Sequence, residues 1–261
     1  TSDPGVPTPG PAWMLVGASN LTLLLPHLVR RAPVARLAVR AGHGRALTCR
    51  SRFLVRALPP SAPSPGADEA APALPWALDR LLVMDLGLDV LYGASVQAVV
   101  EALERLIASA GEPPTMLIRP PVASVQRLDG VRFGLLRRLF FPGRAMPREV
   151  LIERLSQLDE ALLDLAGRRS CQLSQWPERW VSADAIHLRL AARGEATQWL
   201  LERLAAGSAA GSAEEPPVPE GRPGGAFVRL RAWPERCSIG PLRLSRRQPC
   251  VETPEFELWV Q

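Results

Sequence analysis

The segment WMLVGASN, residues 13–20, decides the interpretation of the fold. Its apolar residues end at Gly17, and a short apolar run bounded in this way is typical of a buried strand. The next segment, residues 20–31, is expected to be a helix, although Pro26 lies in its middle. A strand that runs directly into a helix indicates an α/β fold, and it places Ser19 at the turn between the two elements.

The same alternation of apolar runs and amphipathic segments continues toward the C-terminus. Further strands are predicted at Val34–Val39, Arg80–Met84, Thr115–Arg119 and Ser170–Leu173, and further helices at Arg45–Leu58, Ser95–Ala110, Pro147–Ala166 and Leu188–Ala205. Strands that alternate with helices at this spacing form βαβ units, so we expect a parallel sheet with helices on both faces. Such sheets bind ligands beyond the carboxyl ends of their strands.

Composition divides the chain into a main domain and flanking segments. Residues 1–12 are expected to form a flexible arm, and residues 13–205 carry the alternating elements, interrupted by a Pro-rich exposed loop at 59–75. Residues 206–225 have the composition of a flexible linker. A β-rich C-terminal appendage is predicted for residues 226–261, with strands at Phe227–Trp233, Ser238–Leu244 and Glu255–Val260. Because it is too short to hold a large core, we expect it to pack on the main domain or on a partner protein.

Ser19, Asp184 and His187 are the candidate catalytic residues. A serine at a strand-to-helix turn faces the cleft, where the helix N-terminus offers backbone N–H groups to an anion. The position also suits a serine that only caps the helix, so this motif alone leaves both interpretations open. Serine becomes a nucleophile when a histidine takes its proton and an aspartate orients that histidine. Asp184-Ala185-Ile186-His187 supplies both groups, and its combination with Ser19 favours a serine ester hydrolase.

These motifs resemble those of the SGNH, or GDSL-type, hydrolase superfamily, which has four sequence blocks that each follow a strand. VGASNL resembles the first block, with Ala18 where the family often has Asp, and Asp184 and His187 match the last block. The segments GASNLT, GHGR and DLGLDVLYG are similar to a poorly characterised bacterial branch. The resemblance covers about residues 12–205. It implies a three-layer α/β/α sandwich of the flavodoxin type, and a Ser-His-Asp triad that hydrolyses ester or acyl substrates without a metal or organic cofactor.

The resemblance also implies where the oxyanion hole lies. The glycine of the second block falls in AGHGRAL, at Gly44 or alternatively at Gly42, and His43 between them is a candidate for lining the cleft. In the third block, Leu88 occupies the position where the family has an asparagine that donates to the oxyanion. Leucine donates no hydrogen bond, and loss of one such donor typically lowers the rate about 100- to 1,000-fold. Asn20 is a candidate for a replacement amide.

Two functions follow from this set of residues. The first is a serine esterase or acyl hydrolase of a small ester or acylated substrate, weakened by Leu88 at the asparagine position. The alternative is a non-catalytic protein with the SGNH fold, whose cleft or C-terminal appendage binds a partner protein.

For other polar and aromatic side chains near the motifs, the sequence gives weaker evidence of a role in the site. Asp85 and Asp89 flank the altered third block, and Asp89 is interpreted as a turn or helix-capping residue. His27, in the first predicted helix, is interpreted as structural. Trp176 and Trp180 precede the Asp-x-x-His motif and could line a substrate pocket, although packing is the commoner role of such side chains.

The composition argues against several other functions. The net charge of +5 is compatible with nucleic-acid binding, but the arginines are scattered among acids and there are only one Tyr and six Phe for stacking. The chain has no Lys, which excludes a P-loop. Its four cysteines form no CxxC pair and its three histidines lie far apart, so no zinc site is expected. Cys237 and Cys250 could face each other across a hairpin, which spacing alone does not decide.

The hydropathy pattern predicts a protein of the cytoplasm. No apolar run reaches the roughly 20 residues that span a bilayer, so no transmembrane segment is expected. No signal peptide is visible, although a leader that had been removed would leave the same sequence.

Overall fold

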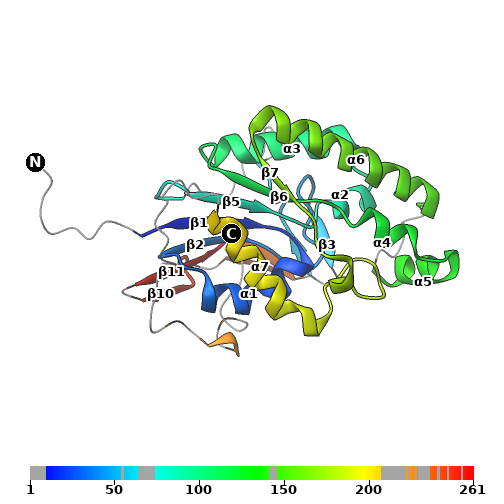
Figure 1. Cartoon of the computed structure of the whole chain (residues 1–261). Coiled ribbons are helices and arrows are strands. Elements are labelled where there is room, and N and C mark those ends of the chain that lie inside the picture. The colour runs from blue at the N-terminus through cyan, green and yellow to red at the C-terminus, as the bar shows by residue number, and fades with distance from the viewer. Residues whose placement is uncertain are drawn as a thin grey trace, which may run out of the picture.

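The computed structural model describes residues 10–53, 56–63, 74–140 and 146–206, and in the C-terminal part residues 222, 224–226, 228, 236–239, 242–245, 247–253 and 255–261. Its centre is a seven-stranded sheet in the order β10-β11-β2-β1-β5-β6-β7 (Figure 1). The strands predicted for the main domain all lie in this sheet and run parallel: β1 (Ala12–Val16), β2 (Arg36–Arg40), β5 (Arg80–Val83), β6 (Thr115–Ile118) and β7 (Gln172–Ser174).

The strand order brings the carboxyl ends of β1 and β5 side by side. In their parallel register, Met14 lies opposite Leu81 and Val16 opposite Val83. From this pair the chain continues to β2 on one side and to β6 and β7 on the other, so the sheet has its topological switch point here. Ser19, which follows β1, and Asp85, which follows β5, are therefore neighbours although they are far apart in sequence.

Helices cover both faces of the sheet, as the sequence predicts. α1 (Ser19–Arg31) and α7 (Arg193–Ala206) pack together on one face, and α3 (Val96–Ser109) and α6 (Arg148–Arg169) pack together on the other (Figure 1). Alternate residues of β1 enter the two cores: Trp13 and Leu15 join the first, and Met14 and Val16 join the second. A strand buried on both faces in this way needs the continuous apolar run seen in the sequence.

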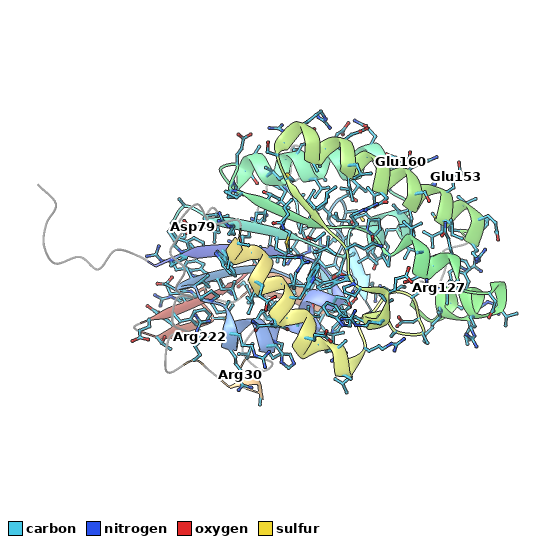
Figure 2. All side chains as sticks on the ribbon, in the orientation of Figure 1. Arg30, Asp79, Arg127, Glu153, Glu160 and Arg222 are labelled. Atoms are coloured by element: carbon cyan, nitrogen blue, oxygen red, sulfur yellow. The ribbon has the colours of Figure 1, made fainter. Side chains whose placement is uncertain are left out.

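The polar faces of the helices point to solvent. Glu153 and Glu160 project outward from α6 (Figure 2), and Leu151, Leu155, Leu158, Leu162 and Leu165 of the same helix are buried. No helix in the described part of the chain combines the length and the apolar character that a membrane span requires.

Five short helices lie in the loops that follow β5, β6 and β7. α2 (Gly87–Leu91) follows β5, and α4 (Val122–Gln126) and α5 (Gly130–Phe140) follow β6. The 3-10 helices η1 (Glu178–Trp180) and η2 (Leu190–Ala192) follow β7. Since these loops leave the carboxyl ends of the strands, the short helices build the walls around the switch point.

Two of the three strands expected for the appendage, Ser238–Leu244 and Glu255–Val260, coincide with observed strands, which are divided between two sheets. β8 (Arg236–Ile239) and β9 (Leu242–Ser245) extend an antiparallel sheet that begins with β3 (Ser51–Phe53) and β4 (Arg56–Leu58). β11 (Phe256–Val260) runs parallel to β2 in the main sheet, and β10 (Val251–Thr253) covers its outer edge. The open edges of β2 and β4 explain this division, because each offers unpaired backbone groups to a new strand.

The helix predicted at Arg45–Leu58 is wrong, because this segment contains a loop followed by β3 and β4. Tertiary contacts override its local pattern: the Asp89 carboxylate accepts hydrogen bonds from the backbone N–H groups of Leu47 and Thr48, and β4 pairs with β8. Of the predicted strand Phe227–Trp233 the structure describes only Val228, which is helical and not in a strand. Cys237 is buried in β8, whereas Cys250 precedes β10 in the other sheet, and both are thiols.

Candidate active site

Ser19 is the first residue of α1, and its hydroxyl does not cap the helix. Ala18 holds the N-cap position, and the first turn is capped by the Asp85 carboxylate, which accepts a hydrogen bond from the backbone N–H of Leu21 at 3.4 Å. The chain passes close to β5 here, since a Cβ on Gly17 would lie 2.7 Å from Met84 Cγ. Ser19 Oγ instead lies 2.9 Å from His187 Nε2, so the geometry excludes the interpretation of Ser19 as only a capping residue.

His187 connects Ser19 to Asp184. Its Nδ1 atom lies 2.7 Å from Asp184 Oδ2, while its Nε2 atom faces the serine hydroxyl. A carboxylate accepts only, so the Nδ1 proton points to Asp184 and leaves the Nε2 lone pair to accept from Ser19. This tautomer is the one that takes a proton from a serine. The three residues predicted from the sequence thus meet in a single hydrogen-bonded series.

The loop that carries Asp184 and His187 is closed tightly on itself. Val181 and Leu188 form a β-bridge, and Ala185 has a left-handed backbone with φ of 62°. Asp184 Oδ1 accepts hydrogen bonds from the backbone N–H groups of Ile186 and His187, at 3.0 and 2.9 Å, and from the Ser182 hydroxyl. Burial alone raises the pKa of Asp184, but the hydrogen bonds from His187, Ser182 and the backbone outweigh it and hold that pKa well below its ordinary range. Asp184 is therefore a carboxylate at neutral pH.

This loop has to cross the sheet to reach Ser19. β7 lies three strands away from β1, a distance of about 14 Å at ordinary strand spacing. Asn20 fastens the loop at its destination: its Nδ2 atom donates to the Ile186 carbonyl at 3.0 Å, and its Oδ1 atom accepts from Leu188 N–H at 2.9 Å. The same Nδ2 atom also donates to Asp85 Oδ1 at 2.8 Å. Both amide hydrogens are thus used, and Asn20 does not supply the replacement oxyanion donor that the sequence suggested.

Asp85 is the site residue whose role sequence reasoning missed. Its Oδ2 atom accepts from the backbone N–H of Ala18 at 2.8 Å, and its Oδ1 atom accepts from Asn20, so it ties the turn before Ser19 to the end of β5. Its backbone is left-handed, with φ of 64°, which only a strongly determined environment maintains in a non-glycine residue. Burial raises the pKa of Asp85, and the hydrogen bonds from Asn20, Ala18 and Leu21 oppose this increase. The available sequence signal was its position just beyond a central strand.

Residues of the third sequence block form hydrogen bonds with the loop that contains the second block. Asp89 is buried in α2 and accepts hydrogen bonds from Leu47 N–H, Thr48 N–H and the Thr48 hydroxyl, at 2.9, 2.8 and 2.7 Å. Its pKa is raised by burial, against these hydrogen bonds. Tyr92 donates its hydroxyl to the Gly44 carbonyl at 2.9 Å. Asp89 thus anchors residues 47 and 48 of another loop, and it does not cap a turn or helix end of its own segment as predicted.

Gly44 and Gly42 have different roles in the second block. Gly44 has a left-handed backbone with φ of 71°, and neither its N–H nor that of Ser19 donates a hydrogen bond within the described residues. Gly42 is a close-packing residue, since a Cβ there would lie 2.2 Å from Leu58 Cδ1. Gly44 therefore remains the better of the two candidates for an oxyanion donor.

His43 lies within the electrostatic influence of His187. The pKa of His43 is lowered by desolvation and then by electrostatic interactions with His187, Arg56 and Arg193. It does not belong to the residues that line the pocket beside Ser19, and neither does His27 further along α1.

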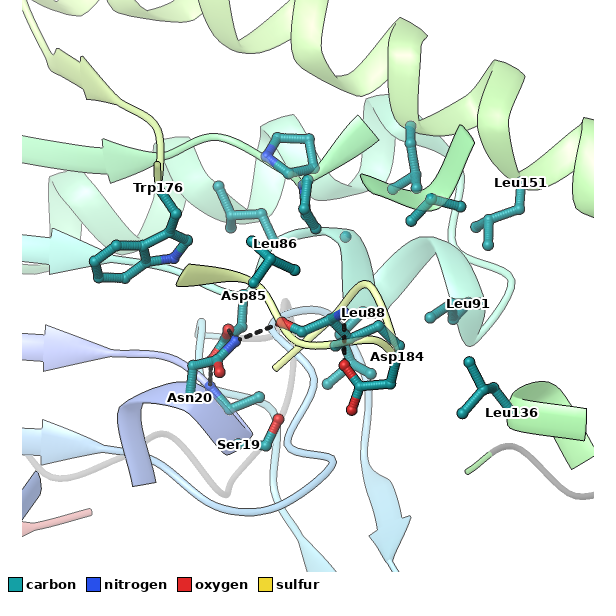
Figure 3. A pocket seen from close by; sticks show the side chains of 18 of the residues that line it. Ser19, Asn20, Asp85, Leu86, Leu88, Leu91, Leu136, Leu151, Trp176 and Asp184 are labelled. Carbon is teal, nitrogen blue, oxygen red and sulfur yellow. Dashed lines mark hydrogen bonds between the residues drawn. The ribbon is translucent and has the colours of Figure 1, made fainter. Parts of the chain in front are cut away.

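A mostly apolar pocket opens beside Ser19. Its walls come from α2, α4, α5 and α6 (Figure 3), and they include Leu86, Leu88, Leu91, Val125, Leu128, Phe133, Leu136, Leu151, Leu155 and Trp176. Leu88 therefore presents an alkyl group to the cavity that Ser19 shares. Trp176 lines the pocket and also packs against Trp180 and Trp199, so it combines the two roles considered for the tryptophans.

Among the described residues, no group of three His, Cys, Asp or Glu side chains is placed to hold a metal ion.

No protein-family model matches this sequence, and no curated protein matches it. Several solved esterase structures resemble its backbone. A carbohydrate acetylesterase family member from Sinorhizobium meliloti is 14% identical, with a TM-score of 0.43 over 75% of this chain and 99% of that one. A lipase/acylhydrolase from Enterococcus faecalis is 14% identical, with a TM-score of 0.45 over 75% and 96%. An aryl esterase from M. smegmatis is 13% identical, with a TM-score of 0.44 over 75% and 99%. At these sequence identities and TM-scores, the activity has to be inferred from the side chains of the site.

Proposed function

We propose that this protein is an SGNH-like serine hydrolase of ester or acyl substrates. The observation that carries the proposal is the series Ser19 Oγ, His187 Nε2, His187 Nδ1 and Asp184 Oδ2, with contacts of 2.9 and 2.7 Å. These are the distances expected of a nucleophile, its base and the group that orients the base. The apolar pocket beside Ser19 supports an acyl group as the part of the substrate that is bound.

In the proposed reaction, Ser19 Oγ attacks the ester carbonyl while His187 Nε2 takes its proton. The C–O bond to the leaving alcohol then breaks, and His187 returns the proton to that alcohol. Water hydrolyses the acyl-enzyme with His187 again as the base, and Asp184 stabilises the imidazolium in both halves. The backbone N–H groups of Ser19 and Gly44 are the proposed donors to the oxyanion.

Labelling with a fluorophosphonate tests this proposal. We expect one adduct on Ser19 by peptide mass spectrometry, none in Ser19→Ala, and an unchanged adduct in Ser109→Ala, which alters an exposed serine at the end of α3. A folded wild-type protein that forms no adduct on Ser19 contradicts a catalytic role.

A second candidate function, a non-catalytic binding protein of the same fold, is favoured by one observation. Leu88 lines the pocket where the resembling family has an amide donor. Replacement Leu88→Asn should raise the hydrolysis rate of a short ester about 100- to 1,000-fold if only this donor is lacking. Leu91→Asn, which alters another leucine of the same pocket wall, is the matched control and should not raise the rate. Activity that appears only in Leu88→Asn would identify the parent protein as the non-catalytic form.

A further inference from the structure

The helix α5 has an unusual outer face. Val131, Leu135 and Leu139 are 83, 67 and 68% exposed, and they recur every four residues along one side of the helix. Exposed apolar side chains are common singly, but a contiguous group marks a surface that meets another apolar phase or a partner. α5 lies at the periphery of the molecule, next to α4 (Figure 1), so this side of the helix is accessible.

The opposite side of the same helix forms part of the pocket. Phe133 and Leu136 line the cavity that also contains Ser19, and Phe133 is almost fully buried. α5 thus separates the pocket from solvent with apolar side chains on both of its sides.

Positively charged side chains flank the exposed apolar stripe, which consists of Val131, Leu135 and Leu139. Arg132 and Arg138 are exposed beside it, and the α5 sequence GVRFGLLRRLF contains no acid. Asp129 forms an ion pair with Arg132 at 3.3 Å, but both side chains are more than half exposed, so it neutralises this charge weakly. The exposed apolar stripe and its arginines supply the two contributions that hold a helix at the surface of an anionic lipid aggregate, which are buried apolar area and attraction to anionic head groups.

A second copy of this chain fits the stripe less well. A two-fold contact between two α5 helices would bring the arginines of one copy against those of the other. Repulsion between these like charges opposes such a dimer, whereas anionic head groups would be attracted to them.

We propose that α5 docks the protein on an anionic lipid surface, from which a lipid ester enters the pocket beside Ser19. Docking is a binding property of the helix, and only the ester cleavage rests on the proposed hydrolase function. The two are therefore tested separately.

Docking is measured by co-sedimentation of the full chain carrying Ser19→Ala, so that catalysis cannot alter the lipid. We expect binding to vesicles of phosphatidylglycerol and phosphatidylcholine, and much weaker binding to phosphatidylcholine alone. The double variant Leu135→Ser/Leu139→Ser should bind at least about tenfold more weakly because it loses buried apolar area. Arg132→Gln/Arg138→Gln should bind roughly thirtyfold more weakly. Leu163→Ser, which alters an exposed leucine of α6, should bind like the parent.

A second readout separates docking from chemistry. With Ser19 restored, both double variants should keep their rate on a soluble short ester and lose hydrolysis of vesicle lipid. The proposal is overturned if the folded parent does not bind anionic vesicles, or if the α5 variants bind as well as Leu163→Ser. Sedimentation that finds a wild-type dimer dissociated by Leu135→Ser/Leu139→Ser also overturns it, in favour of a subunit contact. If the wild-type protein binds anionic vesicles but hydrolyses no ester, the proposed hydrolase function is rejected and the docking proposal stands.

Discussion

At the scale of single residues, Asp184 determines which tautomer of His187 faces Ser19. Replacement Asp184→Asn keeps the size of the side chain but allows it to donate to Nδ1, which places the imidazole proton on Nε2. We expect kcat on a soluble short ester to fall by about 10⁴ with little change in KM. Asp164→Asn on the exposed face of α6 is the control and should leave kcat unchanged. A small loss in Asp184→Asn would mean that another group orients His187.

Asp184 also makes stability depend on pH in one direction. Its pKa in the folded protein lies well below the value of about 3.9 expected for the unfolded chain. The unfolded state therefore takes up this proton first, so the stabilisation is complete above about pH 4 and is lost as the pH falls further. Urea unfolding at pH 7 and pH 3 should show the wild type losing more stability than Asp184→Asn. An equal loss in both proteins would assign the acid sensitivity to other groups.

Asn20 is expected to affect the proposed reaction through the loop that it holds. Asn20→Ala leaves the Ile186 carbonyl, the Leu188 N–H and one oxygen of Asp85 without this partner. We expect a loss of about 1–3 kcal/mol in the free energy of unfolding, together with a lower kcat because His187 is less well placed. Chemical denaturation and kcat measurements on a short ester check both parts. Gln198→Ala on the exposed side of α7 should change neither quantity.

At the scale of elements, β11 is part of the main core although it lies at the C-terminal end of the sequence. Leu258 is completely buried against β2, and β11 joins the same apolar cluster as α1 and α7. Leu258→Ala should therefore lower the free energy of unfolding by about 2–5 kcal/mol. Leu242→Ala in β9, where the side chain is 63% exposed, should change it by no more than about 0.5 kcal/mol. Equal small effects at both positions would mean that β11 is peripheral to the fold.

At the scale of the whole molecule, the pocket exists because helices from the loops after β5 and β6, residues of the loop after β7, and α6 meet beside Ser19. Its apolar walls predict that hydrolysis of p-nitrophenyl esters improves with acyl length. Burial of each methylene contributes about 0.8 kcal/mol, or roughly fourfold in kcat/KM, until the cavity is filled. Leu91→Trp should shift the optimum to shorter chains, whereas Leu163→Trp on α6 should not. A profile that favours acetate in the wild type would argue that the pocket binds something other than the acyl group.

Much of the fold followed from local patterns along the sequence. Apolar runs such as WMLV in β1 predict strands buried on both faces, and the regular alternation with helices predicts a parallel sheet. The position of Ser19 after β1 and the Asp-x-x-His motif after β7 were also readable, because both depend on residue type and order. These features are local, so a linear pattern is enough to indicate them.

The tertiary structure decided the features that depend on contacts between distant segments. The C-terminal strands pair with the open edges of β2 and β4, which places them in two different sheets. Residues 45–58, where a helix was predicted, form a loop and strands because of their contacts with Asp89 and β8. The Asp85 carboxylate and the Asn20 amide became linked only because β1 and β5 are neighbours in the sheet. The sequence by itself determined which side chains were available to the candidate active site. The packing of the sheet decided which of these side chains are in contact. A hydrogen bond requires its two atoms to lie about 3 Å apart in space, whatever their separation along the chain.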